Sequence, residues 1–131
     1  MQRIDRIFGV LLILAACGHT VCTILWTQPM SGIFIWSLGS SLAGLLLGTL
    51  NIVRAARPHD KTLAAITPVG TACWAAVAFA FGKSIGDVLD PRPLGHVIIS
   101  TILVAFSATT LRGTPRKLVS PGNVVLNQRG D

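Results

Sequence analysis

The chain has 131 residues, of which 51% are hydrophobic and only 12% are charged, and its formal net charge at neutral pH is +6. This composition is far more apolar than that of an average soluble domain, so a separate soluble domain of ordinary composition is excluded. The positive charge does not indicate nucleic acid binding, because the basic residues are dispersed and no RNA- or DNA-reading motif accompanies them.

Four apolar stretches are each close to the length of about 20 residues that a helix needs to cross a bilayer. They cover residues 7–26, 32–53, 63–81 and 94–111. The sequence therefore predicts an all-α, polytopic integral membrane protein in which residues 1–111 form a four-helix transmembrane bundle. Residues 112–131 contain Gly and Pro without a periodic apolar face, which predicts a flexible, basic cytoplasmic tail.

The first stretch follows Arg3 and Arg6, and residues 14–17, with the sequence LAAC, match a lipobox. A lipobox is cleaved before a cysteine that then becomes lipid-modified in bacterial lipoproteins. A signal peptide needs polar, extended chain after its cleavage site, whereas residues 18–26 continue the apolar pattern. We therefore expect an intact first helix, with cleavage and acylation of Cys17 as the alternative.

The second and third stretches carry small residues four positions apart, a spacing that lets helix backbones approach closely in a membrane. In the second stretch they are Ser40, Gly44 and Gly48, and in the third they are Ala72, Ala76 and Ala80. We expect these two faces to pack against each other within one chain, with packing between two copies as the alternative. Asn51 is expected to form an interhelical or headgroup hydrogen bond.

The fourth stretch is the most polar, with the hydroxyl residues Ser100, Thr101, Ser107, Thr109 and Thr110. Hydroxyl groups can donate to carbonyls of their own helix, so this pattern is typical of polarity that is tolerated inside a bundle.

Acidic residues are few, and their positions limit the function. The chain has no Glu, and its five Asp residues all lie outside the four apolar stretches. Proton or cation relays rely on an acid at membrane depth, so the sequence does not favour proton-coupled transport.

The basic residues predict the orientation. Nine of the eleven Lys and Arg residues fall on the side of the two termini and the central connection, and only Lys83 and Arg92 fall on the other side. Cytoplasmic loops carry the excess of basic residues, so both termini are predicted in the cytoplasm. The compact loops favour a bacterial inner membrane, a plasma membrane in which lipids are the first partners.

His19 is, cysteines aside, the only ionisable side chain well inside a predicted span. Such a group is by default a candidate functional residue, because burying it costs free energy. Thr23 lies one turn away on the same face, and Trp74 is near mid-depth in the third stretch. We take these residues and His96 as candidate ligand-binding residues. The alternative is a neutral His19 bonded to a carbonyl or to Thr23, with Trp74 packed in the bundle.

A b-type haem held by His19 and His96 would need both side chains at similar depth. Counting about 1.5 Å per residue from the outer helix ends places His19 several ångströms deeper, so this site is strained. Cys17 and Cys22 are about 140° apart around a helix and cannot bind one metal ion together. The sequence predicts no cofactor and no metal. It also predicts no catalysis, since no acid is positioned to orient His19 as a base.

These observations favour a non-catalytic accessory subunit or a lipid-phase binding protein, built for helix packing, alone, as a homo-oligomer or in a larger membrane complex. One alternative is a small dimeric transporter or channel lined by His19, Thr23 and the hydroxyls of the fourth stretch. The other is a b-type haem membrane protein.

Overall fold

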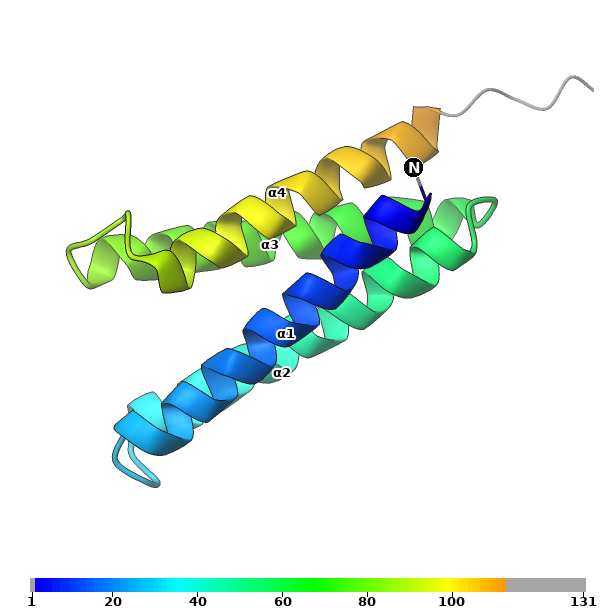
Figure 1. Ribbon diagram of the computed structural model, residues 1–131. Helices are drawn as coiled ribbons and strands as arrows, with labels where there is room; N and C mark the ends of the chain where they lie inside the picture. The colour runs from blue at the N-terminus through cyan, green and yellow to red at the C-terminus, as the bar shows by residue number, and fades with distance from the viewer. Residues whose placement is uncertain (1, 113–131) are drawn as a thin grey trace, which may run out of the picture.

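The computed structural model describes residues 2–112, which form four α-helices joined by short connections (Figure 1). The helices are α1 (Gln2–Trp26), α2 (Gly32–Ala56), α3 (Lys61–Ser84) and α4 (Pro91–Arg112). Each of them is long and apolar enough to span a membrane. The all-helical fold with four candidate spans is therefore confirmed. The predicted tail lies outside the described residues from position 113 onward.

Three of the helices, α1, α3 and α4, begin earlier than predicted, and polar residues outside the apolar stretches cap two of them, α3 and α4. The Asp60 carboxylate accepts a hydrogen bond from the Leu63 amide at 2.9 Å, and the Asp90 carboxylate accepts one from the Arg92 amide at 2.9 Å. Pro91 suits the first turn of α4, since an N–H there would have no helical partner. The start of α1 at residue 2 brings Asp5 into a helix that was predicted to begin after it.

The four helices form two antiparallel hairpins, α1 with α2 and α3 with α4. Contacts within each hairpin are extensive, whereas contacts between the hairpins are sparse. Figure 1 shows the hairpins meeting near the N-terminus and the α2–α3 connection, and diverging toward the loops 27–31 and 85–90. The fold is therefore a V, with a closed end where the hairpins meet and an open end at the two loops.

Two glycines of α2 lie in the seam between α1 and α2. A Cβ atom added to Gly48 would lie 3.0 Å from the carbonyl oxygen of Gly9 and 3.1 Å from the backbone nitrogen of Ile13. A Cβ atom added to Gly44 would lie 3.0 Å from the Cβ of Ala16. The spacing thus marked a true packing face, as small residues do in membrane helices. Its main partner is α1 rather than α3.

The alanine stripe of α3 does not pack against α2, so that prediction is wrong. Ala72, Ala76 and Ala80 are all exposed. The buried residues of α3 are Ala64, Thr67, Thr71, Ala78 and Gly82. Because α3 packs mainly against α4, its contact face includes Thr71, which is one residue step or about 100° away from the stripe.

Polar side chains fill much of the interior, while apolar side chains cover the outside. In the described part of the chain, the buried polar residues are Asp5, Thr23, Ser41, Asn51, Arg54, Thr67, Thr71, His96, Ser100 and Ser107. Large apolar side chains are exposed on every helix, among them Leu14, Leu46, Val69 and Ile98. In a water-soluble core, Asp and Arg are rarely buried and Leu and Ile usually are. The reversed pattern suits a hydrocarbon environment.

Gly48→Ala is expected to destabilise the protein by about 1–3 kcal/mol, because the added methyl group meets backbone atoms of α1 that cannot move independently. Gly39→Ala in the same helix is the matched control, since a Cβ atom there meets nothing within 4 Å. The control should be neutral or stabilising by up to about 1 kcal/mol, because Ala favours helices more than Gly. Thermal unfolding in mild detergent measures both, and equal melting temperatures would contradict the seam.

Candidate functional site

A cleft of about 690 Å³ lies between the hairpins in the open half of the V. Most of its wall comes from α2 and α3, with apolar side chains that include Ile33, Val77 and Phe81. The polar side chains that line it are those of His19, Ser37, Ser40, Trp74, Ser84, Arg92 and His96. A largely apolar cleft of this size with a few converging polar groups is typical of a small-molecule site.

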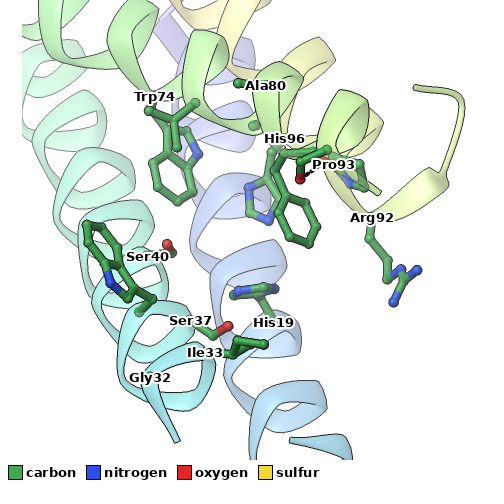
Figure 2. Close-up of a pocket in the computed structure, with 15 residues that line it drawn as sticks. His19, Gly32, Ile33, Ser37, Ser40, Trp74, Ala80, Arg92, Pro93 and His96 are labelled. Carbon is green, nitrogen blue, oxygen red and sulfur yellow. Dashed lines mark hydrogen bonds between the residues drawn. The ribbon is translucent and has the colours of Figure 1, made fainter. Parts of the chain in front are cut away.

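Two histidines from different hairpins meet in this cleft (Figure 2). The ring centroids of His19 and His96 are 6.3 Å apart, and the rings are nearly perpendicular at 87°. Trp74 lies on the other side of His96, with ring centroids 5.6 Å apart and an angle of 85°. The structure thus brings together three of the four predicted ligand-binding residues.

The depth difference between His19 and His96 is smaller than predicted. Helix α4 begins at Pro91, three residues before the predicted start, so His96 lies about 4.5 Å farther from the helix end than expected. Counted from the helix ends, His19 is then only about 3 Å deeper than His96, and their ring centroids lie 6.3 Å apart. Counting residues from the edge of an apolar stretch fails where capping residues lengthen the helix.

Two residues lie in places other than those predicted: Thr23 is not at the cleft, and Ser40 is. Thr23, predicted at the ligand site, is buried outside the cleft wall, and its hydroxyl donates to the carbonyl oxygen of His19 at 2.9 Å. Ser40, predicted in a packing face, is half-buried and lines the cleft. Trp74 links cleft and seam, since its ring lies 3.5 Å from the Cβ position of Gly44.

An ion pair stands at the mouth of the cleft. Arg92 donates from Nε to both carboxylate oxygens of Asp90, at 2.9 and 3.2 Å, and also from Nη2. These hydrogen bonds lower the pKa of Asp90 to about 2, so the carboxylate is ionised throughout the physiological range. The positive charge of Arg92 is therefore matched by a charge of opposite sign directly beside it.

The sequence did not reveal the polar cluster at the closed end. Arg54 is 1% exposed, and its Nη2 donates to Asp5 Oδ1 at 2.6 Å and to Asn51 Oδ1 at 3.3 Å. Asp5 is 6% exposed. The prediction that no carboxylate lies within the spanning helices is therefore wrong for Asp5. The available signal was that Asp5 and Arg54 carry opposite charges within one turn of their apolar stretches, on the same side.

The cluster reaches all four helices. Asn51 Nδ2 donates to Thr71 Oγ1 at 3.0 Å, and Arg54 Nη1 donates to Thr110 Oγ1 at 3.4 Å. Asp5 comes from α1, Asn51 and Arg54 from α2, Thr71 from α3 and Thr110 from α4. The interhelical role predicted for Asn51 is confirmed. We call these five residues the closed-end cluster.

The hydroxyls of α4 are mostly satisfied by their own helix. Thr101, Ser107, Thr109 and Thr110 each donate to a carbonyl oxygen of α4, at 2.8, 3.0, 2.7 and 3.1 Å. This confirms the interpretation as tolerated polarity for these four residues, whereas Ser100 Oγ is buried without a partner among the described residues. Within the described residues, no three His, Cys, Asp or Glu side chains come close enough to hold a metal ion, and all three cysteines are free.

Comparison of the chain with protein-family models, with curated proteins and with solved structures found no match.

Asp5→Ala is expected to destabilise the protein by about 3–5 kcal/mol, because it leaves the buried guanidinium of Arg54 without its counter-charge. Arg57→Ala is the matched control: Arg57 is exposed and lies just beyond the end of α2, so the change should stay within about 0.5 kcal/mol. Unfolding of both variants in mild detergent gives the comparison. The double substitution Asp5→Asn with Arg54→Gln should recover most of the loss, and failure to recover would show that the charge itself is needed.

Proposed function

We propose that this chain is a non-catalytic, four-span membrane protein that binds an amphiphilic molecule from the lipid phase. The observation that carries the proposal is the cleft between the hairpins, in which apolar walls surround the paired rings of His19 and His96. An apolar chain gains nothing by leaving lipid for another apolar surface, so polar contacts must supply the selectivity. The three ring side chains of the cleft can provide those contacts.

The proposed location is a bacterial inner membrane with both termini in the cytoplasm. The exposed apolar side chains and the buried polar ones support immersion in lipid. The excess of basic residues at the closed end supports placing that end on the cytoplasmic side. The cleft then opens within the outer half of the membrane, between the two hairpins.

A reporter fusion tests the orientation. Alkaline phosphatase, which is active only after export, should be inactive when fused after Asp131 and active when inserted in the α3–α4 loop between Gly86 and Asp87. The reason is that basic residues at the closed end keep it on the cytoplasmic side. The opposite pattern of activities would place the cleft in the inner half and overturn the proposed orientation.

Binding is tested with N-phenyl-1-naphthylamine, a neutral apolar dye that accepts excitation energy from tryptophan. In lipid nanodiscs, Trp36 and Trp74 in the cleft wall should give a saturable energy-transfer signal above the linear background from dye in the lipid. Ala80→Phe places a ring at the cleft wall and should weaken the saturable signal about fivefold, which corresponds to about 1 kcal/mol.

Ala76→Phe is the matched control for that experiment. Ala76 is one turn away on α3 and is also exposed, but it does not line the cleft, so this variant should bind the dye like the wild type. If the wild type gives no saturable signal, or if both variants lose it equally, the cleft is not the binding site.

A b-type haem protein is the second candidate. The ring centroids of His19 and His96 are 6.3 Å apart, which is closer than the depth difference counted from the sequence suggested, and this proximity favours the haem hypothesis. Axial ligation from both sides needs a nitrogen of each ring to point at one iron. In the T-shaped arrangement, an edge of one ring meets the face of the other. Amphiphile binding fits this arrangement without turning either ring. A Soret band in protein produced with added haemin would reverse the ranking.

A further inference from the structure

Two buried nitrogen atoms in the cleft wall have no hydrogen-bond partner among the described residues. They are Nε1 of Trp74 and Nδ1 of His96. His96 is 9% exposed, so it is more than nine-tenths buried. A buried polar group without a partner costs about 1–3 kcal/mol, and hydrocarbon offers no water to satisfy it. These two atoms therefore indicate what a ligand has to supply.

The indole nitrogen of Trp74 determines whether the missing partner is a hydrogen-bond donor or an acceptor. An indole N–H can only donate, so Trp74 needs an acceptor. A neutral imidazole donates from one nitrogen and accepts at the other, so His96 can also donate to such a group. The two rings are adjacent in the cleft, with centroids 5.6 Å apart, so one polar head can lie within reach of both (Figure 2).

The charges around the cleft decide against an ionised head. Among the cleft-lining residues, Arg92 is the only permanent cation, and Asp90 already neutralises it. His19 and His96 touch each other, so two protonated rings would repel. An anionic head below the mouth would thus be buried without a dedicated counter-charge, which is costly in a membrane.

The depth of Trp74 and His96 along their helices also favours a neutral ligand head. Trp74 lies ten residues from the end of α3, or about 15 Å along the helix, and His96 lies five residues, or about 7.5 Å, from the start of α4. A head that reaches both residues has to sit well below the polar surface of a membrane. A neutral group enters that depth at far lower cost than a phosphate or carboxylate.

Resting on the proposed function, we infer that the ligand carries a neutral head with carbonyl-type acceptor oxygens, the chemistry of a lipid-soluble quinone. Its oxygens accept hydrogen bonds from Trp74 and His96. Its ring lies among the aromatic side chains, and its apolar chain leaves along the apolar walls of α2 and α3.

Competition against the bound dye tests this inference with three compounds that share a decyl chain. These are decylubiquinone, with a neutral carbonyl head; decylbenzene, with a ring but no oxygen; and decyl phosphate, with an anionic head. We expect decylubiquinone to displace the dye at concentrations about tenfold lower than the other two, which is about 1.4 kcal/mol.

Two variants locate the hydrogen bonds. Trp74→Phe and His96→Phe each keep a ring but remove the donor, so each should weaken decylubiquinone about five- to tenfold and leave decylbenzene unchanged. Trp36→Phe is the matched control: Trp36 also lines the cleft but is 80% exposed, so its N–H is not buried and quinone binding should not change. The remaining cleft tryptophan reports dye binding in each tryptophan variant.

The outcomes separate the two proposals. Absence of a saturable dye signal in the wild type removes the proposed function itself. A saturable signal that decylbenzene displaces as well as decylubiquinone, or that decyl phosphate displaces best, overturns the carbonyl head alone. Equal loss of decylbenzene and decylubiquinone binding in Trp74→Phe and His96→Phe would show that the two rings only shape the cleft.

Discussion

The buried ion pair between Asp5 and Arg54 is the constraint on which the V-shaped arrangement depends. Removing two charges from water is expensive, and their attraction offsets that cost only when hydrogen bonds satisfy the remaining polar atoms. Asn51 and Thr110 add such bonds to both Nη atoms of Arg54, and Thr71 extends them to α3, while Arg54 Nε has no partner among the described residues. Because an unpaired Arg in hydrocarbon is far worse, separating the hairpins at this end would be strongly unfavourable.

The open half of the molecule is held in a different way. Within the α1–α2 hairpin, glycines keep the two backbones in direct contact. Between the hairpins, rings make the contacts at this level: His96 lies against His19, and Trp74, which packs on His96 within its own hairpin, lies against the Gly44 position of α2. Rings hold helices farther apart than glycines do, so the hairpins diverge away from the closed-end cluster. The cleft follows from this change in side-chain size along the bundle.

The sequence was sufficient for the number, type and approximate limits of the helices, because hydropathy over about 20 residues reports the cost of placing a helix in lipid. It also marked Gly44 and Gly48 as a packing face. It could not name the partner, since four-residue spacing defines a face of one helix but not the helix opposite. The alanine stripe of α3 has the same spacing and remains exposed.

The candidate site was predictable in its residues but not in its geometry. His19 stood out because an ionisable side chain is rare at membrane depth. Its contact with His96 depends on where α4 begins, and that start is set by Asp90 and Pro91, which hydropathy ignores. The closed-end cluster escaped for a similar reason, because Asp5 and Arg54 lie at helix ends where a charge can equally well face water.

A binding site inside a membrane has to reject acyl chains that surround it in great excess, and apolar surface cannot do this because lipid solvates an apolar chain equally well. Discrimination must come from polar groups that an acyl chain leaves unsatisfied. The nitrogens of Trp74 and His96 meet this condition, since each is buried and lacks a partner in the described structure. Sites that hold buried polar groups for a specific partner reject an analogue lacking that partner far more strongly than sites that differ only in apolar contact. Because the ion pairs at both ends of the bundle compensate their own charges, the selectivity that we propose would lie between neutral groups, in the part of the cleft where hydrocarbon would otherwise be the only neighbour.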